Sequence, residues 1–214
     1  DSYWYYLVSF KDANGIVRNI PFNSQSGDSN WRAKVIKGKT YIFNNKGEMK
    51  DGLVKLGTEL NNNLVYNAEG KLIGDTKGGA ISKPLADGVY YFNENSGSVN
   101  GQMVTGKTTV TKDGEDYYYY FEKTTGRAVT DIVKDGVVYG HDGERIDAED
   151  GNSNAIVTLD HDTYYNKKVN GTTCEYIKAG SEVIVSSTGK LRTSGTVKVD
   201  GVKCQVNASA DGNW

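Results

Sequence analysis

The two histidines are the first residues of this chain that could do chemistry. His161 stands between two acids in Asp160-His161-Asp162, and imidazoles with carboxylates are a ligand set that binds metal ions. Adjacent side chains on a strand point to opposite faces, so these three do not converge easily on one ion. His141 lies in a turn, next to Asp142-Gly143. The sequence therefore predicts solvated turns at both histidines and no metal site.

The acidic residues form no recognisable catalytic or calcium motif. The stretch Asp147-Ala148-Glu149-Asp150-Gly151-Asn152 lacks the alternating ligands, the late Glu and the flanking helices of a calcium loop. There is no nucleophile elbow, no His-Glu-x-x-His and no phosphate-binding loop. Glycoside hydrolysis needs two carboxylates in a cleft, in environments that give them different pKa values. Thin hairpins offer no deep cleft. We therefore predict that the chain is not an enzyme and uses no cofactor.

Aromatic residues remain as candidates for ligand contacts. The 214 residues include 15 Tyr, 5 Phe, 3 Trp and 26 Gly but only 2 Pro, and the hydrophobic fraction is 37%. That fraction is low for a chain with one large core. Tyr is amphipathic and suits half-exposed strands better than a deep interior. The composition therefore favours a thin, extended β structure.

Charge and hydropathy argue against nucleic-acid binding and against a membrane span. The 25 basic and 27 acidic residues are interspersed, and the net charge is -2. Without a basic patch, nucleic acid is not expected as a partner. No apolar run approaches the length of a membrane span, so no membrane span is expected either.

Turn signals punctuate the whole chain. Eleven Asn-Gly or Asp-Gly pairs occur between Asn14-Gly15 and Asp211-Gly212, and they are the strongest short signals for a β-hairpin. Punctuation this dense leaves no room for a long helix. The sequence therefore predicts an all-β fold.

One phrase recurs between these turns. An apolar strand ends in an aromatic residue or Val, and a Gly follows, as at Phe10/Gly15, Phe43/Gly47, Tyr66/Gly70, Phe92/Gly97, Phe121/Gly126, Tyr139/Gly143 and Val185/Gly189. After most of these glycines an apolar residue opens a return strand, as in Val17, Met49, Leu72, Ala128, Ile146 and Leu191. One hairpin is marginally stable, but stacked hairpins bury their aromatic faces against one another. We predict a solenoid-like array of about nine stacked β-hairpin repeats.

A polar break at residues 147–154 suggests two domains. After it Tyr is rarer, and Val and Thr are commoner. We predict a β-hairpin repeat array over residues 1–150 and variant hairpins or a cap over residues 151–214. Cys174 and Cys204 lie too far apart in sequence for a clustered metal site. Two free, partly buried thiols are expected, although a disulfide stays possible if their strands are neighbours.

The best-preserved repeat resembles a known family. Trp31 followed by Gly38-Lys39-Thr40-Tyr41-Ile42-Phe43-Asn44-Asn45-Lys46-Gly47-Glu48-Met49-Lys50-Asp51-Gly52 is similar to the cell-wall-binding repeats of Gram-positive surface proteins, which include choline-binding and glucan-binding modules. Residues 88–95, with residues 102–106 as the usual ending, and residues 114–121 match too, and residues 194–203 match more weakly. The resemblance implies a hairpin solenoid that attaches a secreted protein to cell-wall polymer or another glycan, at the cell wall or cell surface, without catalysis.

Departures from the family pattern narrow the site. Choline-binding members hold a quaternary ammonium between three aromatic rings with a Met nearby, because electron-rich rings attract such a cation. Asn30 and Thr40 replace the family's Gly and second Trp, which leaves at most one partial site near Trp31. The candidate ligand-binding residues are Trp31, Tyr41, Phe43, Met49, Tyr66, Tyr90, Phe92 and Tyr119.

A structural role is the alternative. In the run 117–120, alternate tyrosines share one face, and both faces could be structural. The chain would then be a spacer or adhesion stalk of a surface protein with no carbohydrate site of its own. The particular polymer, the number of sites and the oligomeric state stay open at this point.

Overall fold

The computed structural model describes residues 3–11, 14–22, 31–44, 46–57, 64–66, 72–75, 85–95, 97–149 and 151–214, without the side chains of residues 8, 10, 11, 20, 64–66 and 72–75. Every regular element in these ranges is a β-strand, which confirms the all-β prediction. The sheets are small, and none of them closes into a barrel within the described ranges. The part of the chain that the structure describes also contains no helix long and apolar enough to cross a bilayer.

The chain forms two compact units. The first unit comprises Asp1–Thr105 with Phe121–Arg127, and the second comprises Gly106–Tyr120 with Ala128–Trp214. The predicted boundary near residue 150 concerns the type of repeat, and it stays a prediction.

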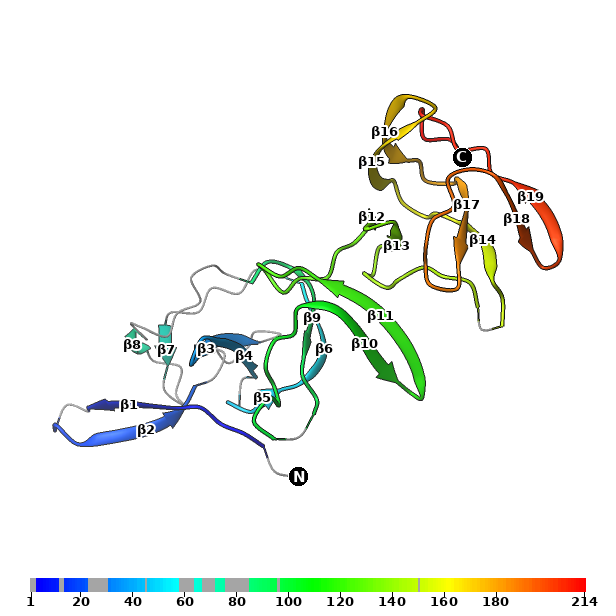
Figure 1. The fold of residues 1–214 in the computed structure, drawn as a ribbon. Helices are drawn as coiled ribbons and strands as arrows, with labels where there is room; N and C mark the ends of the chain where they lie inside the picture. The colour runs from blue at the N-terminus through cyan, green and yellow to red at the C-terminus, as the bar shows by residue number, and fades with distance from the viewer. Residues whose placement is uncertain are drawn as a thin grey trace. The chain divides into compact units, whose positions relative to one another are not determined.

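The first unit is built from short antiparallel pairs (Figure 1). Its strands are β1 (Leu7–Lys11), β2 (Val17–Pro21), β3 (Arg32–Ile36), β4 (Lys39–Phe43), β5 (Met49–Lys50), β6 (Gly52–Leu56), β7 (Leu64–Tyr66), β8 (Leu72–Asp75) and β9 (Gly88–Phe92). Strand β4 pairs with both β3 and β5, and β6 pairs with β9. Burial alternates strictly along β6, as it does when one face of a strand meets a core. That core contains Ala33, Ile42, Val54, Leu56, Leu85, Tyr90 and Phe92.

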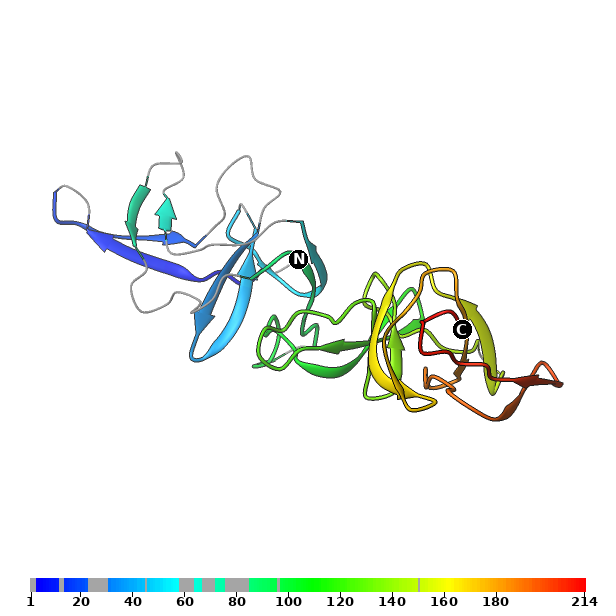
Figure 2. The ribbon, with the colours of Figure 1, turned by 90° about the horizontal axis from the view of Figure 1, so that it is seen from above.

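The second unit has longer hairpins. Its strands are β10 (Gly106–Lys112), β11 (Glu115–Phe121, whose last residue belongs to the first unit), β12 (Ile132–Lys134), β13 (Val137–Tyr139), β14 (Asn154–Thr158), β15 (Thr163–Val169), β16 (Thr172–Ile177), β17 (Glu182–Ser186), β18 (Thr196–Val199) and β19 (Val202–Gln205). A four-stranded sheet has the order β13-β12-β15-β16, and β14 pairs with β17. The last residues return to the end of β16, where the N–H of Lys178 donates to the carbonyl of Gly212 (Figures 1 and 2). The ring of Trp214 packs edge-on against Tyr165 of β15.

Five turns share one hydrogen-bond pattern. The residue that begins each turn is the one after the strand, or in β17 the last residue of the strand. It accepts a bond from the N–H of a turn glycine and donates its own N–H to the carbonyl of the residue after that glycine. The turns run from Asn44 to Gly47, Asn93 to Gly101, Glu122 to Gly126, Gly140 to Gly143 and Ser186 to Gly189. All five glycines have positive φ, which an L residue adopts only with strain. The predicted strand-and-glycine phrase is therefore a real structural unit in these copies.

Two details of the predicted phrase need correction. The turn after Phe92 closes at Gly101 rather than Gly97, because extra residues lengthen it. The return after Gly143 opens at Arg145 rather than Ile146, since Arg145 forms the β-bridge with Tyr139.

Successive turns contact one another through the residue two positions after each glycine. The N–H of Met103 donates to the carbonyl of Thr40 at 2.9 Å. Its side chain lies against the next turn glycine, so a Cβ added at Gly126 would stand 2.5 Å from the Met103 sulfur. The same glycine contact links Met49 with Gly101, Ala128 with Gly143, and Arg145 with Gly189. Glycine at these positions therefore serves both the turn and the contact between hairpins.

The two cysteines do not pair. Cys174 is a buried free thiol, and Cys204 is a half-buried one. Burial raises the pKa of the Cys174 thiol, so it behaves as a small apolar side chain.

Candidate functional site

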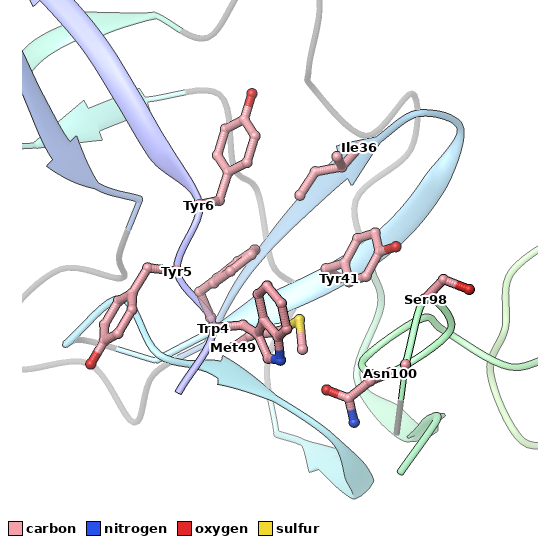
Figure 3. Close-up of a pocket in the computed structure, with 10 residues that line it drawn as sticks. Trp4, Tyr5, Tyr6, Ile36, Tyr41, Met49, Ser98 and Asn100 are labelled. Carbon is pink, nitrogen blue, oxygen red and sulfur yellow. The ribbon is translucent and has the colours of Figure 1, made fainter. Parts of the chain in front are cut away.

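An open pocket of about 250 Å³ lies at a junction of the first unit (Figure 3). Three segments meet there: the N-terminal segment before β1, the hairpin of β4 and β5, and the long turn that ends at Gly101. Its apolar wall includes Trp4, Tyr5, Tyr6, Tyr41, Phe43 and Met49, and its polar rim includes Ser98 and Asn100. The pocket thus combines aromatic rings, a thioether and neutral polar groups.

Main-chain pairing positions the apolar wall. The N–H of Met49 donates to the carbonyl of Trp4 at 2.8 Å, and Tyr5 forms a β-bridge with Glu48. This pairing holds the N-terminal segment against the return strand and leaves Trp4 68% exposed. Tyr41 and Phe43 alternate with Ile42 along β4 and therefore share one face, on which Tyr41 is half-buried and Phe43 is buried edge-on against Phe22.

The long turn supplies the rim. The amide of Asn100 donates to a carboxylate oxygen of Asp51 at 3.1 Å, and Gly101 closes the turn on Asn93. The carbonyl of Ser98 accepts a bond of 2.6 Å from the amide of Gln102. These bonds hold Ser98 and Asn100 in place at the rim. Among the described residues, none with a charged side chain lines the pocket.

The rings of the pocket differ in what already covers them. The ammonium of Lys34 lies 5.1 Å from the centre of the Tyr6 ring, and the ring of Phe22 meets the same Tyr6 edge-on. Burial, and then the charge of Arg32, lower the pKa of Lys34. Figure 3 shows the rings of Tyr5 and Tyr6 pointing away from the region around Trp4. Trp4 is the most exposed ring of the wall.

Three of the predicted ligand residues, Tyr41, Phe43 and Met49, line this pocket, where Tyr41 and Met49 are half-buried and Phe43 is only 1% exposed. Trp31, Tyr90 and Phe92 instead belong to the core of the first unit or pack on it. Tyr90 is buried and donates its hydroxyl to the carbonyl of Ala86, and Phe92 is 0% exposed, so neither offers a face to a ligand in this structure. Tyr66 lies in β7, and its side chain lies outside the described residues.

The remaining candidate, Tyr119, lies in the second unit. It is buried and donates its hydroxyl to Glu144 at 2.8 Å. It lines a more polar hollow of about 280 Å³, in which the guanidinium of Arg145 lies 3.7 Å from the centre of the Tyr118 ring. The chain's own Arg145 therefore covers this face of the neighbouring Tyr118 ring.

Trp4, Ser98 and Asn100 line the pocket without being among the residues predicted for the site. The aromatic run Trp4-Tyr5-Tyr6 is a recognisable signal, but its partners, Glu48 and Met49, lie far along the chain. The rim residues belong to the turn that closes at Gly101 instead of the predicted Gly97. A repeat pattern that allows longer turns would include this turn.

We expect the stability of the fold to fall at alkaline pH. Burial and then the bond to Glu94 raise the pKa of Tyr91 to about 12, and burial with the bond to Glu144 raises the pKa of Tyr119. Unfolded Tyr ionises near pH ~10. The neutral Tyr91 hydroxyl therefore stabilises the folded state fully below the pKa of unfolded Tyr, and this stabilisation is lost as pH rises toward 12. Denaturant unfolding at a series of alkaline pH values should show this fall.

The matched variant for this measurement is Tyr91→Phe, which keeps the ring and removes the ionisable group. Its free energy of unfolding should depend less steeply on pH in the alkaline range. Equal slopes for the variant and the unchanged chain would contradict the assignment to Tyr91.

Comparison with known proteins gave structural likenesses only. No protein-family model and no curated protein matches the chain. It is similar to the modular autolysin LytC from Streptococcus pneumoniae at 16% identity and a TM-score of 0.30, over 92% of this chain and 37% of that one. It is similar to choline binding protein F of the same organism at 24% identity and a TM-score of 0.23, over 68% and 44% of the two chains. For alternansucrase in complex with isomaltononaose the identity is 16% and the TM-score 0.25, over 92% and 15%. In each of these alignments this chain spans less than half of the other protein.

Proposed function

We propose that this chain is a non-catalytic module that binds a cell-wall polymer or another glycan at the surface of a Gram-positive bacterium. The observation that carries the proposal is the open pocket around Trp4, Tyr41 and Met49. The shared turn pattern and the contacts between successive turns support a solenoid-like array of hairpins. In this proposal residues 1–150 form the binding array, and residues 151–214 form variant hairpins or a cap.

The chemistry of the pocket favours a small pendant group on the polymer. Ring faces attract a quaternary ammonium such as choline, and a thioether is soft and polarisable against it. A volume of about 250 Å³ lies below the usual range of drug-sized sites, roughly 300–1,000 Å³. At the rim, Ser98 brings a hydroxyl and Asn100 an amide oxygen, both neutral hydrogen-bonding groups, while the amide nitrogen of Asn100 already donates to Asp51 and Asn93. Stacking of a sugar ring on Trp4 is the competing mode at the same residues.

Replacing Trp4 with Ala should weaken ligand binding about tenfold, since a cation–π contact contributes about 0.5–2 kcal/mol and about 1.4 kcal/mol is a factor of ten. The measurement is retention on purified teichoic acid, peptidoglycan and glucans, followed by calorimetry with choline and with glucan oligosaccharides. Choline binding would identify the ammonium mode, and oligosaccharide binding the stacking mode.

The matched control is Tyr3→Ala. Tyr3 is also an exposed aromatic residue, 54% exposed, but it does not line the pocket. Its variant should bind like the unchanged chain. An equal loss in both variants would mean that the N-terminal segment acts through its fold, and no loss in Trp4→Ala would refute the pocket as the site.

The second candidate is a spacer or adhesion stalk, and a specific observation favours it. Internal cations lie over several aromatic faces, with Arg32 over Phe22 and Arg145 over Tyr118. A face that its own chain already covers is not available to a glycan. If the unchanged chain is retained on no wall polymer or glucan at any salt concentration, the spacer function is supported and the binding function fails.

A further inference from the structure

The second unit gathers three potential metal ligands at one end of a sheet. Asp131 directly precedes β12, His141 follows β13 after one residue, and His161 stands just before β15. Strand β12 is antiparallel to β13, so the start of β12 and the end of β13 lie together. Strand β12 is parallel to β15, so their starts also lie together. The sheet topology therefore brings the three residues to the same edge, although they are far apart in sequence.

The side chains are in contact. The Nδ1 atom of His141 lies 2.8 Å from a carboxylate oxygen of Asp131. The rings of His141 and His161 stack with centroids 4.0 Å apart and planes 11° apart. The candidate ligand atoms of all three residues lie within 4.8 Å of one another. The chain contains two histidines, and both are in this cluster.

The backbone holds Asp131 in place from both sides. Its N–H donates to the carbonyl of Gly140 at 3.1 Å, and its carbonyl accepts from the N–H of Tyr164 at 2.8 Å. Its φ of 47° places it in the left-handed region, which a non-glycine residue adopts where surrounding bonds compensate for the strain. The carboxylate is thus fixed between the segments that carry the two histidines.

From this arrangement we infer a zinc site formed by Asp131, His141 and His161. Zinc takes imidazole nitrogens and carboxylate oxygens, usually in a tetrahedral set that a water can complete. Both histidines are exposed, so an ion reaches them from solvent. Lone pairs of stacked rings lie in nearly parallel planes, so the exposed His161 ring must turn as the ion binds. The cluster then becomes a clip across β12, β13 and β15.

The acid that follows His161 in sequence, Asp162, is not one of its partners in the cluster. One carboxylate oxygen of Asp162, Oδ1, accepts from the N–H of Ala179 at 2.9 Å, and the other, Oδ2, lies 3.9 Å from the ammonium of Lys178. Asp162 is therefore engaged in its own local contacts. The convergence that the Asp-His-Asp triplet cannot supply comes from different strands.

The test is calorimetric titration of the full chain with Zn²⁺ after treatment with a chelator. The variants His141→Ala, His161→Ala and Asp131→Asn should each weaken zinc binding at least about tenfold, because even groups behind the ligands typically contribute 10–100-fold. Circular dichroism checks that each variant is folded. Because the chain has two histidines, the imidazole signals in a proton spectrum report on this site directly, and both should shift with zinc.

Two controls separate this site from others. Asp160→Asn removes an adjacent exposed carboxylate outside the cluster and should leave the affinity unchanged. Cys204→Ser removes the half-buried thiol, a soft ligand that would also attract zinc, and should leave the zinc affinity unchanged too. Absence of zinc binding, binding that persists in His141→Ala, or binding that is lost in Cys204→Ser would overturn the inference.

Discussion

Replacing Phe92 with Ala is expected to lower the free energy of unfolding of the first unit by about 3–5 kcal/mol. The ring is 0% exposed and belongs to the core that includes Val54 and Tyr90. Removing it forfeits the burial of a large apolar side chain and leaves a cavity. Small domains unfold with about 5–15 kcal/mol in all, so this one change removes much of the stability.

Denaturant unfolding followed by tryptophan fluorescence measures this effect, since Trp31 packs on the same core. The matched control is Leu53→Ala on β6, because Leu53 is 41% exposed on the solvent side of the same sheet. That variant should lose less than about 1 kcal/mol. Similar losses in the two variants would contradict the placement of Phe92 in the core and reopen its role as a ligand residue.

Replacing Gly189 with Ala should lower the free energy of unfolding of the second unit by about 2–5 kcal/mol, the sum of a backbone effect and a crowding effect. Its φ of 71° alone makes any L side chain unfavourable by about 1–2 kcal/mol. An added Cβ would also stand 2.5 Å from Cγ of Arg145 and 3.0 Å from the carbonyl oxygen of Ile146. Crowding of this kind adds about 1–3 kcal/mol.

Gly180 provides the control for this second prediction. It precedes β17 as Gly189 follows it, and its φ is 82°, but an added Cβ there meets nothing within 4 Å. Gly180→Ala should therefore lose only the backbone part, about 1–2 kcal/mol. Thermal unfolding of the two variants in parallel gives the comparison. If Gly180→Ala proves equally destabilising, the contact between successive turns contributes nothing measurable.

Local features of the fold could be predicted from the sequence because local chemistry determines them. The turn from Asn44 to Gly47 depends on residues a few positions apart: a glycine with positive φ and an Asn whose side chain accepts from the N–H groups of Lys46 and Glu48. The alternation of side chains along a strand likewise predicts that Tyr41 and Phe43 share one face, and both line the same pocket.

Contacts between distant segments could not be predicted in the same way. Trp4 reaches the pocket because its carbonyl pairs with Met49, and His161 reaches His141 because β15 lies parallel to β12. Neither partner can be read from neighbouring residues. An aromatic residue on a strand also looks the same in sequence whether it is buried in the core, like Tyr90, or half-buried at a pocket, like Tyr41. The pattern identifies the strand, and the packing decides the role.

The turn that ends at Gly101 has an implication for how such modules diversify. Its first and last residues make the same bonds as those of the shorter turns, so residues between them can be inserted without disturbing the hairpin. Here that inserted stretch contributes Ser98 and Asn100 to the pocket rim. Stability and recognition are thereby assigned to separate residues of one repeat. Changes in the length and composition of one turn, whether evolved or engineered, can therefore alter which ligand the pocket binds while the hairpin fold is kept.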